Sequence, residues 1–99
     1  MDSHKQLGGI GDEKPADSKI QGLCDKVKSE FEKKSGTNAA EFKAKKYASQ
    51  VVAGTNYYIK VSTGDGHYCH IKIYEPLRGE PEITGFQLNK SEHDAIHFF

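Results

Sequence analysis

An alternating run, Thr55–Thr63, restricts the fold of this chain more than any other segment. Its apolar residues, Tyr57, Ile59 and Val61, stand at every second position and alternate with Asn56, Tyr58 and Lys60. A period of two is typical of a β-strand that buries one face and leaves the other in water. The run therefore predicts a half-buried strand in a sheet.

Directly before this strand stands Gln50–Gly54, where a hairpin turn is expected because Glu41–Ser49 also resembles a strand, though less cleanly. Hairpin connections are normally polar and rich in glycine, whereas this one carries Val51, Val52 and Ala53. Apolar side chains at a hairpin tip cannot reach the hairpin's own core, so they are available to the surface of another molecule. The pattern leaves one alternative open, in which the two valines are the inward end of a strand.

One helix is expected between Pro15 and Gly36. Pro15–Ser18 supply a fixed proline φ and capping oxygens, and Gly36 ends the helical pattern. The apolar residues in between recur at spacings of three and four and form a narrow stripe on one helix face. They are Ile20, Leu23, Cys24, Val27 and Phe31.

After the helix only strand patterns follow. Gly64–Gly66 has the composition of a tight hairpin turn, Tyr68–Tyr74 alternates again, residues 75–82 form a proline-containing loop, and Ile83–Asn89 resumes a strand. One helix followed by successive hairpins predicts the α+β class, with the helix on the apolar face of an antiparallel sheet. The other face, with its lysines, tyrosines and His70, is expected to face water, and the apolar tail is expected to be partly covered.

Composition and charge exclude several classes of function. Ninety-nine residues make one domain, and fourteen basic residues balance fourteen acidic ones. A neutral chain lacks the positive footprint of nucleic-acid binders and of proteins attached to anionic lipid. Met1–Leu7 is polar and no apolar run approaches a membrane-spanning length, so neither a signal peptide nor a membrane partner is expected.

The cysteines and histidines suggest two rival functions, and neither is favoured. Cys24 and Cys69 are too few for a disulfide framework, which indicates a reduced, cytoplasmic protein with small thiols in its core. Cys69 as the nucleophile of a hydrolase would need exposure, yet it alternates with Ile71 on the buried face. His93 and His97 as metal ligands lack a third partner. No metal or other cofactor is expected.

The segment Gln50–Val61 resembles the central hairpin of the stefins, the type 1 cystatins. The resemblance extends from about Leu7 to Phe99, and it implies one stefin-like domain over residues 1–99 with residues 1–14 as a flexible arm. It also implies the cystatin fold, in which one long helix packs against a five-stranded antiparallel sheet. The other segments that carry it are Leu7-Gly8-Gly9, Lys14-Pro15-Ala16, Asp25–Lys28, His70–Tyr74, Asn89-Lys90 and His93-Asp94.

The resemblance implies a reversible, tight-binding inhibitor of papain-like cysteine proteases, including lysosomal cathepsins, and not an enzyme. In that family three segments line up along one edge of the molecule as a wedge that enters the protease cleft. By position these are Leu7, Gly8 and Gly9 in the arm, Gln50, Val51, Val52, Ala53 and Gly54 in the first hairpin, and Leu77, Arg78 and Gly79 in the second.

The second hairpin departs from the family pattern. Stefins usually carry leucine-proline-glycine there, whereas this chain has Leu77-Arg78-Gly79 and a shorter connection to Ile83, so the contact of this loop is the least defined of the three. A cystatin fold reused for non-inhibitory binding or scaffolding remains the alternative function, and the apolar tip favours inhibition over it. A monomer is expected, with hairpin exchange into a domain-swapped dimer left open.

Overall fold

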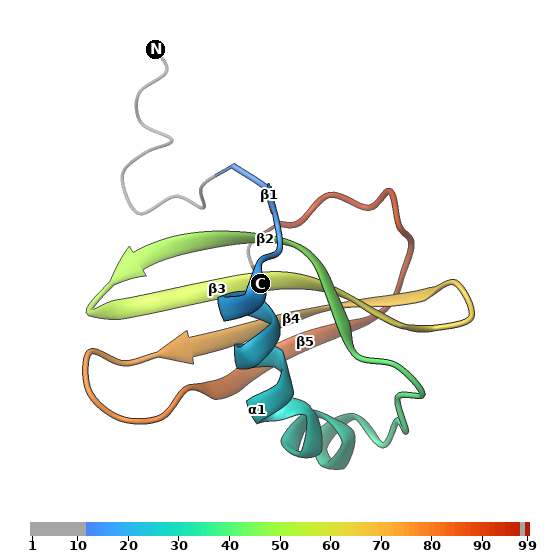
Figure 1. Cartoon of the computed structure of the whole chain (residues 1–99), viewed down its shortest axis with the longest axis horizontal. Coiled ribbons are helices and arrows are strands. Elements are labelled where there is room, and N and C mark those ends of the chain that lie inside the picture. The colour runs from blue at the N-terminus through green and yellow to red at the C-terminus, as the bar shows by residue number, and fades with distance from the viewer. Residues whose placement is uncertain (1–11, 98) are drawn as a thin grey trace.

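The computed structural model describes residues 12–97 and 99, which form one helix and a five-stranded antiparallel sheet (Figure 1). The sheet order follows the chain, β1-β2-β3-β4-β5. This arrangement confirms the predicted α+β class and the helix-on-sheet architecture of the cystatin fold. The elements are β1 (Lys14–Pro15), α1 (Ser18–Ser35), β2 (Lys43–Val52), β3 (Gly54–Gly64), β4 (His67–Glu75) and β5 (Glu82–Lys90).

Helix α1 begins and ends where the capping residues predict. The Asp17 side chain accepts a hydrogen bond from the backbone N–H of Ile20 at 3.0 Å, and Gly36 ends the helix with a φ of +73°. Pro15 differs from the expectation, because it lies in β1 opposite Lys46 rather than in the first helical turn. A proline fits such an edge strand, where its missing N–H costs no ladder hydrogen bond.

The core lies between α1 and one face of the sheet. The predicted helix stripe is buried, and the alternating residues of β3 and β4 meet it. The Phe31 ring lies 5.2 Å from that of Phe42 and 5.5 Å from that of Phe86, so three aromatic rings fill one end of the core. Cys24 and Cys69 are core residues, as predicted.

A β-bulge explains why the pattern of β2 is less clean than that of β3. The register with β3 shifts between Ala44 and Lys46, and a bulge of this kind inserts one extra residue into the strand. Phe42, Ala44 and Tyr47, which are not evenly spaced in sequence, therefore all pack on the core beneath the helix.

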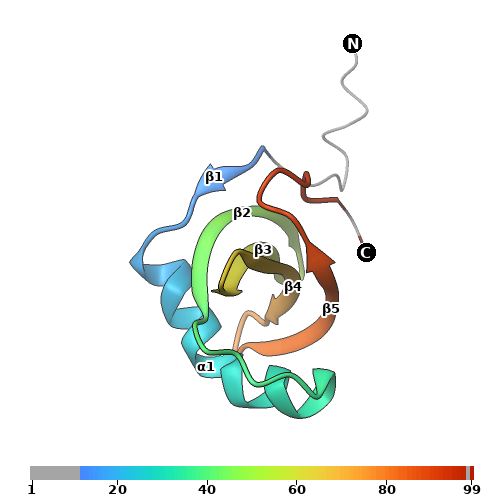
Figure 2. The same ribbon diagram turned by 90° about the vertical axis from the view of Figure 1, so that its right-hand side faces the viewer.

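The middle of the outer sheet face is covered, so the prediction that this face lies in water is wrong there. Tyr58, Lys60 and His70 are 1%, 4% and 0% exposed, because the chain after β5 returns across them toward the segment before β1 (Figure 2). The Lys60 Nζ donates to the Glu92 carbonyl at 2.7 Å, and the Tyr58 ring lies edge-on to Phe99 at 5.4 Å.

Ile96 carries the apolar tail into this second layer, where it is 6% exposed. Its N–H donates to the Glu13 carboxylate at 2.9 Å, which joins positions 83 residues apart. Burial of Ile96 agrees with the prediction that the tail is partly covered; Phe98 lies outside the described residues.

His70 is buried in this layer without a hydrogen bond. Neither of its ring nitrogens has a partner within residues 12–97 and 99. Burial, then the positive charges of Lys90 and Lys60, lower the pKa of His70 to about 4. The carboxylates of Asp94 and Glu13 oppose that shift, so the imidazole is neutral at physiological pH.

Candidate functional site

The first hairpin is tighter than the sequence predicts. Pairing between β2 and β3 continues to Val52 opposite Gly54, so only Ala53 lies between the two strands. The residues expected to form a longer turn are therefore largely strand residues. Near the tip, the side chains of one cross-strand pair are also joined: the Asn56 Nδ2 donates to the Gln50 Oε1 at 3.1 Å.

The two valines of this hairpin lie in water. Val51 is 80% exposed and Val52 is 44% exposed, and neither belongs to the core beneath α1. The alternative in which they form the inward end of a strand is therefore wrong. Ala53 at the tip is also exposed, so the strand ends in an apolar protrusion.

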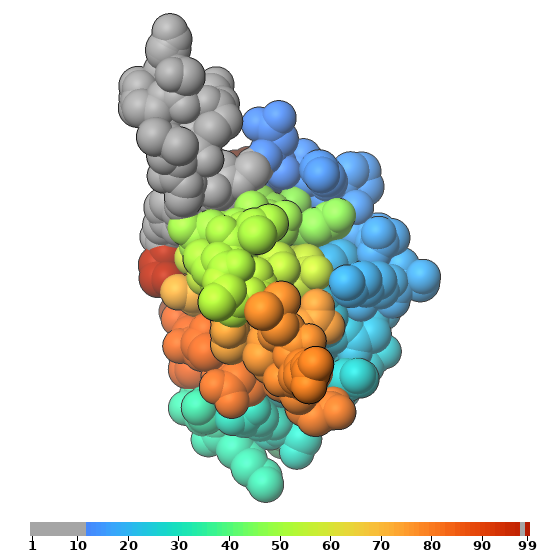
Figure 3. Space-filling model, turned by 90° about the vertical axis from the view of Figure 1, so that its left-hand side faces the viewer, coloured from blue at the N-terminus to red at the C-terminus, as the bar shows by residue number. Residues whose placement is uncertain are grey.

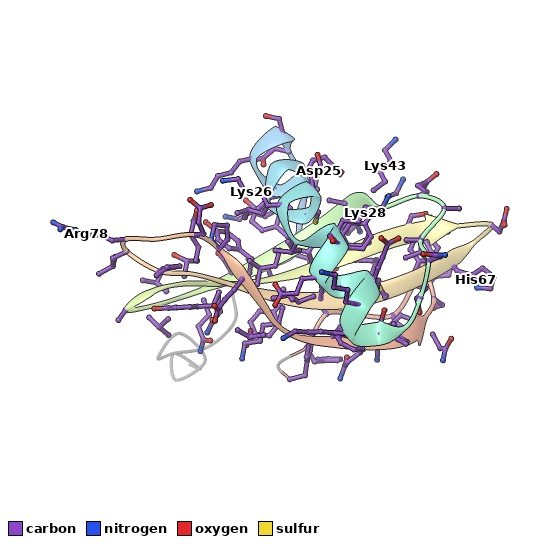
Figure 4. The ribbon with its side chains drawn as sticks, turned by 90° about the horizontal axis from the view of Figure 1, so that it is seen from below. Asp25, Lys26, Lys28, Lys43, His67 and Arg78 are labelled. Atoms are coloured by element: carbon purple, nitrogen blue, oxygen red, sulfur yellow. The ribbon has the colours of Figure 1, made fainter. Side chains whose placement is uncertain are left out.

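The second loop lies beside this tip. It joins β4 to β5, and its Leu77 is 82% exposed. Figure 3 looks onto this end of the molecule and shows the tip of the first hairpin, in yellow-green, directly beside the loop, in orange. Figure 4 shows Arg78 at the outermost point of the loop, directed away from the helix. We call this surface the hairpin edge; its residues are Val51, Val52, Ala53, Leu77, Arg78 and Gly79.

The third predicted segment, Leu7, Gly8 and Gly9, lies outside the described residues. The structure thus brings together two of the three segments that the resemblance implies. The described chain begins close to β2, where Lys14 pairs with Tyr47.

Two residues that support the hairpin edge escaped the sequence analysis. The Tyr74 hydroxyl donates to the Ala53 carbonyl, and the backbone of Glu75 lies directly against Gly54. Tyr74 ends the alternating run of β4 and Glu75 follows it, and nothing in their spacing marks them. Only the register, which sets Tyr74 opposite Asn56, reveals that they reach the tip.

Charged groups connect the hairpin edge to the start of the helix. The Glu75 carboxylate accepts a hydrogen bond from the Tyr57 hydroxyl at 3.4 Å and lies 3.7 Å from the Lys19 Nζ. The Tyr57 hydroxyl, and then Glu75, raise the pKa of Lys19. Lys26 and Glu80 form a second ion pair at 3.8 Å, between α1 and the loop. Such exposed pairs each contribute at most about 1 kcal/mol, so they orient the loop more than they stabilise the fold.

The hairpin edge consists of four apolar side chains, one arginine and one glycine. Cys24 and Cys69 are 0% and 2% exposed, and burial raises the pKa of both thiols to about 12, so the hydrolase alternative with Cys69 as nucleophile fails. Within the described residues, no three histidine, cysteine or acidic side chains form a group able to hold a metal ion. A hollow of about 280 Å³, lined by Phe31 and Leu88 among others, lies away from the hairpin edge. At the hairpin edge, the first hairpin and the second loop project from the end of the sheet (Figure 1).

No helix in the part of the chain that the structure describes combines the length and the apolarity needed to cross a bilayer.

Comparison with known proteins gives the family of the chain. A model of the cystatin domain matches residues 8–94. Cystatin-A of Homo sapiens is 43% identical over 95 residues, which cover 93% of this chain and 97% of that protein. Stefin-C of Bos taurus is 42% identical over 96 residues, covering 94% and 95%. Leukocyte cysteine proteinase inhibitor 1 of Sus scrofa is 39% identical over 103 aligned positions, covering 100% of both. With the helix-on-sheet fold, these matches show that the chain belongs to the cystatin family, among its stefin-type members.

Proposed function

We propose that this chain is a reversible, tight-binding inhibitor of papain-like cysteine proteases, the cathepsins among them, and that it acts in the cytoplasm. The observation that carries the proposal is the hairpin edge, where exposed apolar side chains of two separate connections stand side by side. A soluble protein rarely exposes such side chains together unless another molecule covers them. The name of the related Sus scrofa protein supports a cysteine proteinase as that molecule.

The hairpin edge fits a cleft better than a flat surface. A papain-like active site is a groove with apolar walls beside a cysteine–histidine pair. Val51 and Leu77 are mostly exposed, and Val52 is 44% exposed. Fully burying an exposed side chain of this kind contributes roughly 1.5–3 kcal/mol, and Val52 contributes less because it is already partly covered. The first tip is continuous with β2 and β3, and Leu77 lies two residues after the end of β4. Little conformational entropy is therefore lost when these side chains are buried.

Inhibition without cleavage follows from what enters the cleft. The β2–β3 turn would meet the catalytic groups as a closed hairpin, not as an extended peptide in attack geometry. In the arm, we propose that Gly8 and Gly9 let the backbone bend away from the catalytic cysteine, while Leu7 occupies a pocket on the substrate side. The chain thus needs no catalytic group of its own.

Titration of papain with this protein, read with a fluorogenic peptide, tests the proposal. We expect protease activity to fall in proportion to added protein until one equivalent is present. Mass spectrometry should recover the inhibitor intact, and activity should return on dilution. A folded protein that leaves papain fully active would favour the non-inhibitory binding or scaffolding role, and one that papain cleaves would be a substrate.

A further inference from the structure

We propose that Tyr74 is a positioning residue of the hairpin edge, because its hydroxyl fixes the tip of the first hairpin in one conformation. This inference rests on the inhibitory role proposed above. It adds a residue of β4, outside the three segments that the family resemblance implies, to the parts on which binding depends.

The contact reaches across the sheet. Tyr74 lies on β4 opposite Asn56 of β3, and its side chain extends along the sheet so that the hydroxyl donates to the carbonyl of Ala53. Ala53 stands outside the ladder, since Val52 and Gly54 are the last paired residues of the hairpin. The tip is therefore held from a neighbouring strand as well as by its own two strands.

This hydrogen bond mainly orients the Ala53 peptide; it is not needed to satisfy a buried carbonyl. Ala53 is exposed, so a water molecule would donate a hydrogen bond to its carbonyl if the Tyr74 hydroxyl were absent. The net free energy of such a neutral hydrogen bond is small. Its effect on binding comes from keeping the Ala53 peptide, and with it Val52, in a single orientation before the protease arrives.

Gly54 provides the space that the contact needs. A Cβ at this position would lie 2.5 Å from the Glu75 carbonyl oxygen, 3.0 Å from the Tyr74 hydroxyl oxygen and 3.1 Å from the Pro76 Cα. Backbone therefore packs directly on backbone between the hairpin and the end of β4. Its φ of +104° also favours glycine. Tyr74 and Gly54 are a complementary pair, in which the small residue lets the large one approach.

The same contact links the two halves of the hairpin edge. Pro76, which faces Gly54, is the first residue after β4 and leads directly to Leu77. A shift of the first tip away from Tyr74 would therefore also separate it from the second loop. Loss of the hydroxyl lowers the fraction of molecules with both tips in the binding arrangement, and the apparent affinity falls by that fraction.

The test compares Tyr74→Phe with Tyr68→Phe. Both tyrosines lie on β4 at positions that share a face, and both changes remove one oxygen atom. Tyr68 stands near the other end of the strand, opposite Lys90, and its hydroxyl has no hydrogen bond to another described residue. For each variant we would measure the papain inhibition constant, the unfolding midpoint, and the amide exchange rates of residues 51–56.

We expect Tyr74→Phe to weaken inhibition about fivefold, the effect of one neutral hydrogen bond, and to speed exchange at the tip amides. Tyr68→Phe should change neither. Any decrease in the unfolding midpoint of Tyr74→Phe should be small, because the hydrogen bond contributes about 1 kcal/mol. A loss of that size leaves nearly every molecule folded, so it cannot by itself alter inhibition.

Equal inhibition constants and equal tip exchange in the two variants would overturn the proposal. So would faster exchange throughout the sheet with a lower midpoint, since that pattern indicates a general loss of stability. If the unaltered protein fails to inhibit papain, the proposed function is wrong, and that result is seen before any variant is made. Tip exchange in Tyr74→Phe then decides by itself whether the hydroxyl holds the hairpin.

Discussion

Each end of the sheet contains a tight hairpin turn, but one turn carries apolar side chains and the other carries polar residues and glycine. At the hairpin edge, β2 and β3 are joined through Ala53, which directly follows the exposed Val51 and Val52. At the far end, β3 and β4 are joined by the exposed pair Asp65 and Gly66, with φ values of +54° and +76°. Positive φ at both positions characterises the hairpin turn that best matches the strand twist. Figure 4 shows how far apart the ends are, with Arg78 at one and His67 at the other.

This contrast separates what folding requires from what binding requires. The far end shows that a hairpin of this sheet closes with polar residues alone. The exposed valines at the other end therefore serve no need of the turn, and they cost solubility. A comparison within one molecule thus points to the hairpin edge as a binding surface, and the variants below test it in order of expected effect.

A charge at the hairpin edge should have the largest effect. Val52→Asp would bury an unpaired carboxylate in the protease complex, which costs several kcal/mol, so the inhibition constant should rise at least about a hundredfold. His67→Asp places the same carboxylate at the far end and should leave inhibition unaltered. Thermal unfolding of Val52→Asp should stay within a few degrees of the parent, because Val52 lies outside the core. If Val52→Asp is unfolded, Val52 contributes to the stability of the fold, and the claim that it serves only binding is wrong.

A fall in pH should lower the free energy of unfolding through His70, which is buried on the outer sheet face between the two ends. The folded state holds the pKa of His70 at about 4, below the ordinary 6.5, so the unfolded chain binds the extra proton first. The contribution of neutral His70 is complete above about pH 6.5 and is lost as the pH falls toward about 4, a decrease of about 3 kcal/mol in unfolding free energy.

Urea unfolding at several pH values measures this slope. His70→Phe removes the titrating group and should flatten the curve between about pH 6.5 and about pH 4, while His67→Phe, at an exposed histidine of the same strand, should keep it. The groups that face His70 are Lys60, Lys90, Asp94 and Glu13, and they are present in both variants. An unchanged slope in His70→Phe would assign the acid sensitivity to the carboxylates instead.

Alanine at two turn glycines tests the difference in backbone packing. Gly54→Ala places a Cβ 2.5 Å from the Glu75 carbonyl oxygen, so the strand must move, whereas nothing lies within 4 Å of a Cβ at Gly66. Both positions have positive φ, which costs about 1 kcal/mol for alanine. Gly54→Ala should therefore lose about 2 kcal/mol more unfolding free energy than Gly66→Ala, and only Gly54→Ala should weaken inhibition. Equal losses in chemical denaturation would show that the close approach relaxes freely.

The smallest effect is expected at Arg78. Its charge lies at the outermost point of the second loop, where exposed ion pairs contribute at most about 1 kcal/mol. We expect Arg78→Pro to change inhibition by less than about tenfold, and mostly for proteases with acidic groups beside the far half of the cleft. Inhibition constants against several cathepsins measure this, and an unchanged selectivity profile would remove Arg78 from the specificity of the edge.

The sequence predicts the parts of the fold that local patterns control. Spacings of three and four define α1, strict alternation defines β3 and β4, and the glycines around Asp65 define a turn. The apolar tip of the first hairpin could be recognised as unusual because Val51 and Val52 contradict the ordinary chemistry of turns.

Long-range contacts account for what the sequence could not predict. Lys60 and His70 occupy polar positions of their strands, and their burial depends on a tail that is anchored through Ile96 to Glu13. Alternation describes only one strand, so it cannot show what returns to cover its polar face. Tyr74 was missed for the same reason, since its contact with Ala53 exists only once the register is known.

The short strand β1 sets how far the arm can reach. Lys14 lies beside Tyr47 in a strand antiparallel to β2, so in β1 the direction toward the N-terminus is also the direction toward Val52 in β2. The end of β2 lies five residues beyond Tyr47, a path of about 17 Å. Lys14 follows Leu7 by seven positions, and a chain of that length spans up to about 25 Å when extended. This length is enough for Leu7 to reach beyond the valine tip, and deleting three of the intervening residues would leave that leucine short.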